Sequence, residues 1–216
     1  MADPYWPLFD LRVRTPRLEI RLANDDDLYR LNQVADGGIH DPSTMPFSIP
    51  WTDDPTPLRQ RRSLQWAWSK RAQWSEESWT FTGVVLVEGA PVGIQDLTAE
   101  RFAALRTVST GSWLGRSSQG RGLGREMRTA ILHLAFEGLG AIEAHSGAFH
   151  DNAASMATSR SLGYRPNGEQ LVLRRGQPDR LVNLVLDRDT WMSLRRDDIT
   201  IHGLESCLDM FGSPGF

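Results

Sequence analysis

The chain has 216 residues, of which 40% are hydrophobic and 24% charged, so it can bury the core of one domain or of two small ones. Its formal net charge of -3 argues against nucleic acid or an anionic membrane surface as a partner. Cys207 is the only cysteine, which excludes an internal disulfide, and no secretory signal or membrane-spanning run is visible, so we expect a cytoplasmic protein.

Strand and helix patterns alternate through the first third of the chain. Residues 17–22 alternate apolar and charged side chains, which predicts a half-buried strand. Asn24 is a suitable N-cap for a helix running to about residue 35, because three aspartates occupy its first turn. Three prolines within residues 37–54 predict an ordered but irregular loop, and Pro57 begins a helix that reaches about residue 74.

The later elements are predicted in the same way. A turn at residues 88–91 separates two strand-like runs, residues 79–87 and 92–97. Further strands are expected at residues 106–114, 142–149, 170–175 and 181–187, and helices at residues 122–136, 152–162 and from Asp189. Because no strong linker interrupts this series, we expect one α+β or α/β domain.

The most informative segment, residues 118–127, reads SQGRGLGREM. Three glycines at alternating positions precede an amphipathic helical pattern. Glycine has no Cβ to hold a ligand away and tolerates unusual backbone angles. The free N–H groups of the following helix turn favour an anion, so the segment predicts a phosphate-binding loop.

Several kinds of glycine loop are compatible with part of this pattern. A Walker A loop requires a lysine that the segment lacks. A Rossmann fingerprint requires a third glycine where Arg125 stands, and no βαβαβ repeat lies near the N-terminus. A glycine-rich turn without a ligand, and the pattern Gln-x-x-Gly-x-Gly, are the remaining interpretations.

Gln119, Gly122 and Gly124 satisfy that last pattern, and here the chain resembles the GNAT superfamily of acyl-CoA-dependent N-acyltransferases. It is most similar to the branch containing the bacterial ribosomal-protein N-acetyltransferases. The other matching segments are Thr15-Pro16-Arg17-Leu18, Gly111-Ser112-Trp113-Leu114, Asp151-Asn152-Ala153-Ala154-Ser155 and Ser161-Leu162-Gly163-Tyr164. Four motifs at coherent spacing make this resemblance more specific than the loop alone.

The resemblance implies a mixed, mostly antiparallel central sheet flanked by helices, with a splayed strand pair that holds CoA. It implies a single domain over residues 1–216, with a core of about 15–187 and a C-terminal extension over 188–216. The expected donor is acetyl-CoA or succinyl-CoA, and the expected acceptor is a primary amine of a protein or a small molecule. No metal is expected, since the sequence has no His/Cys cluster with ligand spacing.

Roles for individual residues follow from the same resemblance. The expected cofactor-binding residues are Trp113, Leu114, Gln119, Gly120, Arg121, Gly122, Leu123, Gly124, Arg125, Asn152 and Ser155. The backbone N–H of Leu114 is expected to polarise the thioester carbonyl. Ser155 is expected to protonate the leaving thiolate, with Asn152 positioning it, although both residues also suit a helix N-cap. For Arg121 and Arg125, a solvated helix face is the alternative to phosphate binding.

The general base is not identified by the motifs. Related enzymes commonly carry a carboxylate two residues before the glycine at Gly111, and this chain has Ser109 there. The candidates that could replace this carboxylate as the general base are Asp96, His145, the His40-Asp41 pair and a chain of water molecules.

The acceptor is expected to contact the irregular loop and the tryptophan-rich helix after it. Its candidate residues are His40, Asp41, Phe47 and Trp51, with the aromatic side chains more often core than ligand platform. Residues 6–11 and 40–42 are similar to a mycobacterial GNAT enzyme implicated in protein-lysine succinylation, and His40 is a candidate for a succinyl carboxylate. A non-catalytic acyl-CoA sensor is the alternative function, and exposed sheet edges with apolar segments after Asp187 suggest a homodimer.

Overall fold

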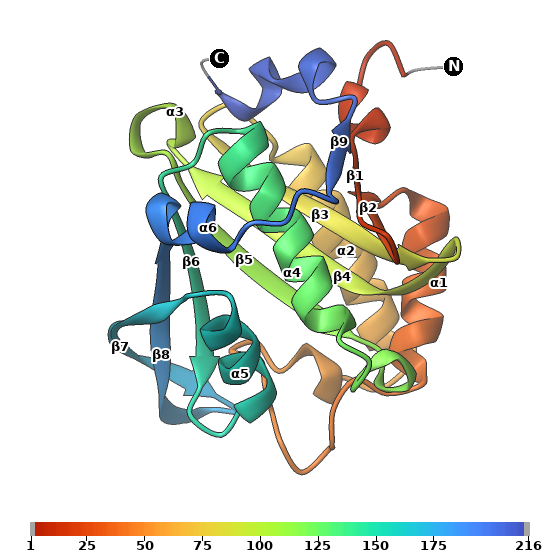
Figure 1. Ribbon diagram of the computed structural model, residues 1–216. Helices are drawn as coiled ribbons and strands as arrows, with labels where there is room; N and C mark the ends of the chain where they lie inside the picture. The colour runs from red at the N-terminus through yellow and green to blue at the C-terminus, as the bar shows by residue number, and fades with distance from the viewer. Residues whose placement is uncertain (1–2, 214–216) are drawn as a thin grey trace.

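The chain folds around one nine-stranded sheet in a computed structural model that describes residues 3–213 (Figure 1). The strands are β1 Arg12–Arg14, β2 Glu19–Leu22, β3 Ser78–Val87, β4 Ala90–Glu100, β5 Thr107–Leu114, β6 Glu143–Phe149, β7 Arg165–Arg174, β8 Gln177–Asp187 and β9 Thr200–His202. Their order is β7-β8-β6-β5-β4-β3-β2-β1-β9. Only the β5–β6 pair is parallel, so the predicted mixed, mostly antiparallel sheet is confirmed.

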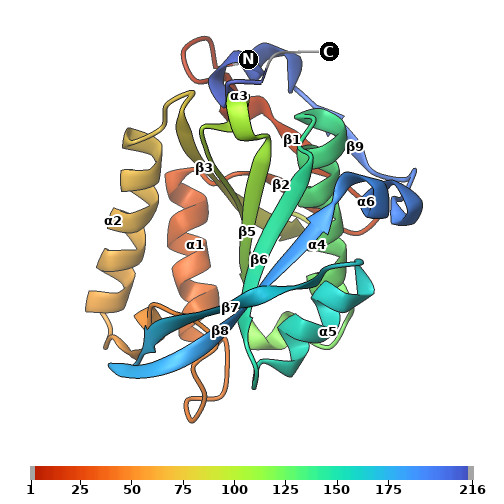
Figure 2. The ribbon, with the colours of Figure 1, turned by 90° about the vertical axis from the view of Figure 1, so that its left-hand side faces the viewer.

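Helices cover both faces of this sheet. They are α1 Asp25–Asp36, α2 Leu58–Ala72, α3 Phe102–Leu105, α4 Leu123–His133, α5 Ala153–Ser161 and α6 Arg188–Leu194. In Figure 2, α1 and α2 lie on one side of the strands, and α4 and α5 lie on the other. The predicted cap of α1 is confirmed, since the Asn24 side chain accepts a 2.9 Å hydrogen bond from the backbone of Asp27, which bonds back to Asn24.

Each face of the sheet has its own apolar core. The α1/α2 core comprises Ala23, Leu28, Leu31, Ala67, Val84, Leu86 and Ile94. The larger core on the other face includes Leu97 of β4, Leu114 of β5, and Met127 and Ile131 of α4. Since side chains alternate between the faces of a strand, neighbouring residues of β4 and β5 serve different cores.

The parallel pair at the centre of the sheet is short. β5 and β6 are in register only from Thr107–Glu143 to Ser109–His145, whereas β6 continues along β8 to Phe149. Beyond the last pair, the hydroxyl of Thr110 donates to the carbonyl of His145 over 3.3 Å. The two strands then part, as expected for the splayed pair.

The C-terminal segment belongs to this sheet. β9 pairs antiparallel with β1, and neither strand was predicted. Trp191, Cys207 and Phe211 are fully buried in the larger core, so these apolar residues after Asp187 serve the fold of the chain itself. Residues 1–2 and 214–216 of the predicted domain lie outside the described residues. Within residues 3–213, no helix has the length and apolar character needed to cross a membrane.

Candidate active site

The glycine loop forms the N-terminus of α4. Gly120 and Gly122 have φ of 72° and 77°, in the left-handed region that glycine occupies at low cost. Gly122 is the N-cap of α4 and no side chain caps the helix there. Because the backbone N–H of Glu126 donates to Gly122 over 3.2 Å, the N–H groups of residues 123–125 precede the first helical bond. The loop therefore presents unpaired backbone donors at the positive end of a helix dipole.

The side chain of Gln119 fastens this loop to its neighbours. Its amide nitrogen donates to the carbonyl of Leu114 over 2.8 Å and to that of Ile39 over 2.6 Å. The first bond ties the loop to the end of β5, and the second ties it to the irregular loop after α1. Gln119 thus fixes the loop conformation, and its side-chain donor is already engaged by the protein.

The Thr15-Pro16-Arg17-Leu18 motif supports the same loop from the other side. The Nε of Arg17 donates to Glu126 over 2.5 Å, and its Nη1 donates to the carbonyl of Arg121 over 3.0 Å. The hydroxyl of Thr15 donates to Glu126 over 2.6 Å. The Glu126 carboxylate is 4% exposed, whereas the Arg17 side chain is 51% exposed, so the ion pair lies at the surface with its acidic partner buried. The motif therefore helps to order the turn that begins α4.

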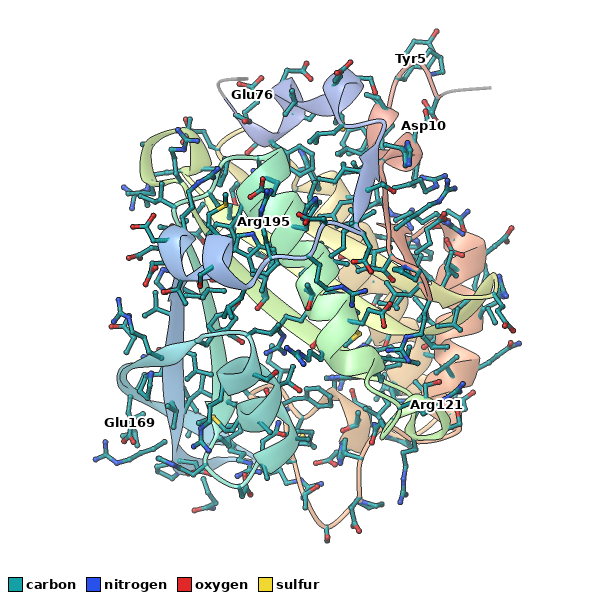
Figure 3. The ribbon with its side chains drawn as sticks, viewed as in Figure 1. Tyr5, Asp10, Glu76, Arg121, Glu169 and Arg195 are labelled. Carbon is teal, nitrogen blue, oxygen red and sulfur yellow. The ribbon has the colours of Figure 1, made fainter. Side chains whose placement is uncertain are left out.

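The space in front of the loop is open. A Cβ at Gly120 meets no atom within 4 Å, and one at Gly122 meets only the Arg17 side chain at 3.5 Å. Gly120 and Gly122 are thus required by backbone angle and not by protein crowding, so the backbone in front of them is accessible. Arg121 and Arg125 are exposed beside it, and Figure 3 places Arg121 at the foot of α4.

The end of β5 offers a further donor on the side where β6 has departed. The N–H of Gly115 donates to Val92 of β4 over 2.9 Å. Since successive N–H groups of a strand point to opposite sides, that of Leu114 points away from β4. The β5–β6 register ends at Ser109, so the Leu114 N–H has no partner in that pairing. Its role in polarising a thioester carbonyl stays a prediction.

The start of α5 has the expected capping geometry. The side chain of Asn152 accepts a 3.2 Å hydrogen bond from the backbone N–H of Ser155, so capping by Asn152 is confirmed. Ser155 itself is half-buried on the first turn of the helix. α5 packs against α4, where Arg128 donates to the hydroxyl of Ser159 over 2.9 Å. The two helices therefore flank the region where β5 and β6 part.

Among the candidate bases, Asp96 has the most unusual environment. It pairs with Gly111 across β4 and β5, and a Cβ at Gly111 would lie 3.9 Å from its Oδ2. Its Oδ1 is buried and has no hydrogen-bond partner among the described residues. Burial raises the pKa of Asp96 to about 8, with Lys70 acting weakly in the opposite direction. Ser109, two residues earlier on β5, is exposed.

His145 is the second candidate base on this part of the sheet. It is paired with Ser109 in the β5–β6 register. Its Nε2 lies 3.3 Å from Glu143, and the imidazole is 34% exposed. His145 therefore faces solvent next to the strand position where a carboxylate was expected.

Aromatic rings connect the irregular loop to β5. The ring centroids of His40 and Phe47 lie 5.7 Å apart, those of Phe47 and Trp51 5.6 Å, and those of Trp51 and Trp113 5.8 Å. We call these four residues the aromatic row. It joins three of the four predicted acceptor residues to a predicted cofactor residue. The fourth, Asp41, is exposed and accepts hydrogen bonds from Ser43, which lower its pKa.

The bonds of the His40 ring lie within the loop itself. Its Nε2 is 2.7 Å from the Thr52 hydroxyl, and its Nδ1 is 2.8 Å from the carbonyl of Asp41. Both ring nitrogens thus have partners, so binding a carboxylate through His40 requires breaking one of these bonds. The predicted order of this loop follows from such contacts.

Two arginines at the tip of the β7–β8 hairpin were not identified from the sequence. Arg174 donates to the carbonyl of Met45 over 2.7 Å and to Asp151 over 2.9 Å. Arg175 makes two bonds to Asp53, of 2.7 and 2.8 Å. They fasten the aromatic-row loop to the hairpin and to the turn before α5. No local pattern signals these pairs, because Arg175 and Asp53 are 122 positions apart.

Other predicted features lie away from this region. The aromatic side chains of the tryptophan-rich helix were expected to be more often core than ligand platform, but Trp66 and Trp68 of α2 are 40% and 41% exposed. Trp74 instead stacks on Trp79 in the larger core.

Burial raises the pKa of the Cys207 thiol to about 12. In the described part of the chain, no group of three or more His, Cys, Asp and Glu residues is arranged to hold a metal ion.

Comparison with known proteins identifies the class. A family model described as an acetyltransferase (GNAT) domain matches residues 17–165, which is more than half of the sequence. The chain belongs to the GNAT acetyltransferase family, and acyl transfer from a CoA thioester is confirmed as its class of reaction.

Solved structures with the same fold include ribosomal-protein acetyltransferases. The chain is similar to Mycobacterium smegmatis RimJ in complex with a CoA disulfide, with a TM-score of 0.70, 16% identity, and coverage of 94% of this chain and 95% of that one. RimL, a ribosomal L7/L12 alpha-N-protein acetyltransferase in complex with coenzyme A, gives a TM-score of 0.64 and 15% identity, with coverage of 82% of this chain and 97% of that one. A Salmonella typhimurium acetyltransferase that modifies the N-terminal serine of L7/L12 gives a TM-score of 0.63 and 15% identity, with coverage of 80% of this chain and 96% of that one.

Proposed function

We propose that this protein transfers an acyl group from acyl-CoA to a primary amine by direct attack of the amine on the thioester. One observation carries the proposal: the unpaired donors at the N-terminus of α4 lie beside the end of β5, at the region where β5 and β6 part. A phosphate site and a strand edge with free N–H groups are the two features that a CoA thioester needs. The same two features support the family's reaction in this chain.

The acyl-CoA substrate, which donates the acyl group, is assigned to the α4/α5 side of the sheet. The backbone of residues 119–124 binds the pyrophosphate, and Arg121 and Arg125 contribute charge-assisted bonds. The backbone of Trp113 and Leu114 holds the pantetheine arm in a strand-like manner. The N–H of Leu114 then binds the thioester oxygen and stabilises the negative charge that grows there during attack.

Proton transfer is assigned to Asp96 and Ser155. During transfer, a C–N bond forms between the amine and the acyl carbon, and the C–S bond breaks. Asp96 accepts the proton that the amine loses, because its raised pKa and its unpartnered Oδ1 suit a base working near neutral pH. Ser155 supplies a proton to the thiolate and Asn152 holds the turn that carries it. Asp96 replaces, on the neighbouring strand, the carboxylate that Ser109 lacks.

The acceptor is assigned to the face opposite the donor, next to the aromatic row. Asp96, Gly111 and Trp113 lie on the α1/α2 side of the sheet, by alternation along β4 and β5. Phe47 and Trp51 extend this surface away from the strands. A protein N-terminal amine is the preferred acceptor, since neighbours of the same fold are described as modifying ribosomal L7/L12. His40 and Asp41 order the loop that carries the row.

Turnover with a defined amine tests the proposal. Purified protein is mixed with acyl-CoA and a peptide bearing a free N-terminus, and acylated peptide and free CoA thiol are quantified together. Equal amounts of both products support the proposal. CoA binding without product across a broad panel of peptides and small amines assigns the chain to the alternative, a non-catalytic acyl-CoA sensor.

Two further properties stay predictions of this proposal. A cytoplasmic location follows from the cysteine content and from the CoA donor. A homodimer is expected to use the edge strand β7, on which Leu171 and Leu173 are 69% and 66% exposed. Sedimentation of the purified protein checks the second expectation.

A further inference from the structure

Two buried polar atoms without hydrogen-bond partners belong to residues that face each other on β3 and β4. Thr82 is 4% exposed, and among the described residues neither its hydroxyl nor the Oδ1 of Asp96 has a partner. Thr82 and Asp96 are directly paired in the antiparallel register, so their side chains share one face of the sheet. Since buried polar groups are nearly always hydrogen-bonded, two unpartnered ones at paired positions require a physical reason.

The neighbouring pair of residues shows that the spacing permits a bond. Thr80 and Thr98 are paired two residues further along the same strands, and the hydroxyl of Thr98 donates to that of Thr80 over 3.2 Å. The pairing pattern of an antiparallel ladder repeats every two residues, so Thr82 and Asp96 form the same type of pair. The aspartate side chain also reaches one bond further than that of threonine. Rotation about side-chain bonds alone therefore brings the Thr82 hydroxyl and Asp96 together.

The two carboxylate oxygens of Asp96 have different surroundings. Oδ2 is the oxygen that would lie 3.9 Å from a Cβ at Gly111. It is therefore next to β5 and to the surface assigned to the acceptor. Oδ1 is the oxygen that the protein encloses. One oxygen is thus placed for the substrate and the other for a partner within the protein.

The charged groups around Asp96 do not provide that partner. Lys70 of α2 acts on Asp96 only weakly. α1 also packs on β4, but its buried Asp27 is held by an arginine of β2. His145 and Glu143 lie on β6, beyond β5, and contact each other. Within residues 3–213, none of these groups is hydrogen-bonded to Asp96, which leaves the hydroxyl directly opposite on β3 as the candidate partner.

We propose that Thr82 is a positioning residue whose hydroxyl donates a hydrogen bond to Oδ1 of ionised Asp96, an inference that rests on the proposed acyltransferase function. A hydroxyl both donates and accepts, so it bonds to the carboxylate before the amine loses its proton and to the carboxyl group afterwards. The bond to the charged form is the stronger one, so Thr82 favours the ionised base. It also keeps Oδ2 toward the amine, where the proton is received.

The pH dependence of turnover in three variants tests the inference. Thr82→Val removes the hydroxyl at nearly constant shape. The rise of turnover with pH should then move up by about 1 to 2 pH units, with about 10- to 100-fold lower turnover at pH 7 and unchanged CoA affinity. Thr82→Ser keeps a hydroxyl and should restore the original profile. Thr80→Val is the matched control, because it removes a hydroxyl of the same strand face and should leave the profile in place.

Two results overturn the inference. An unchanged pH profile in Thr82→Val means that the hydroxyl does not act on the base. An equal displacement of the profile in Thr80→Val means that any hydroxyl on this face of β3 has the same effect, so that Thr82 has no particular role.

Titration of the Asp96 carboxyl separates this inference from the proposed function. Carbon-13 NMR follows this group without any substrate, and Asp96→Asn identifies its signal. If no acyl donor gives product but Thr82→Val moves the titration to higher pH, the function is refuted and the Thr82–Asp96 bond stands. If amines are acylated and the titration is the same in Thr82→Val, the function stands and the bond is refuted.

Discussion

Replacement of Asp96 by asparagine removes a buried ionisable group at almost constant shape. The pKa of Asp96 is raised from 3.8 to about 8 by burial. Between these values the folded chain keeps a proton that the unfolded chain releases, so this contribution to stability is complete below pH 4 and is lost as the pH rises through 8. Asparagine stays neutral and has no such loss. We therefore expect Asp96→Asn to be stabilised relative to the unmodified protein at high pH.

The size of the effect follows from the shift. One pKa unit corresponds to about 1.4 kcal/mol, so a shift of about four units sets an upper bound near 6 kcal/mol. Asp96 is half-buried, and solvent screening reduces this bound. We expect roughly 2 kcal/mol at pH 9, or a rise in Tm of about 4 to 8 °C, and almost no difference at pH 5.

Thermal unfolding from pH 5 to pH 9 measures this difference. Asp197→Asn is the control, since Asp197 is 92% exposed and its substitution should give a difference that does not grow with pH. The rate of acyl transfer in the unmodified protein should rise to a plateau above about pH 8, and Asp96→Asn should lose about 100-fold in turnover. A Tm difference that is constant from pH 5 to pH 9 contradicts the raised pKa, and unchanged turnover excludes Asp96 as the base.

Three further substitutions test the donor side. Gly122→Val should weaken CoA binding at least about 100-fold by filling the loop. Gly176→Val is the control, since Gly176 has the same φ of 77° and lies far from the loop, and it should leave CoA affinity unchanged. Equal CoA affinities of the two variants refute the loop assignment. Ser155→Ala should lower turnover about 10- to 100-fold with little change in CoA affinity. Ser161→Ala on the same helix is the control and should retain full turnover. Equal turnover in the two variants removes Ser155 from the mechanism. Arg17→Met should weaken CoA binding about fivefold by freeing Glu126 and the loop, as calorimetry can show.

Features set by local sequence were predictable. The cap at Asn24, the turn at residues 88–91 and the helix after Gly122 depend on residues within one or two turns of one another. The glycine loop was found for the same reason, since its backbone angles and helix dipole are properties of one short segment.

Features set by long-range packing were not predictable from the sequence. The pairing of β9 with β1 joins segments about 190 residues apart and has no local signature. The burial of Arg128 depends on the packing of α4 against α5 and β5, and the same arginine on an exposed helix would be unremarkable in sequence. The high pKa of Asp96 likewise arises from burial in the folded chain, which no pattern of neighbouring residues encodes.

We expect a CoA thioester bound between α4 and the splayed strands to acylate an amine. The most direct measurement incubates the purified protein with an acyl-CoA and an N-terminally free peptide, and follows peptide mass and free thiol in one reaction. We expect the peptide amine to gain one acyl group for each CoA released, and Gly122→Val to lose both products. Release of CoA without acylated peptide, or tight CoA binding with neither product, would contradict it.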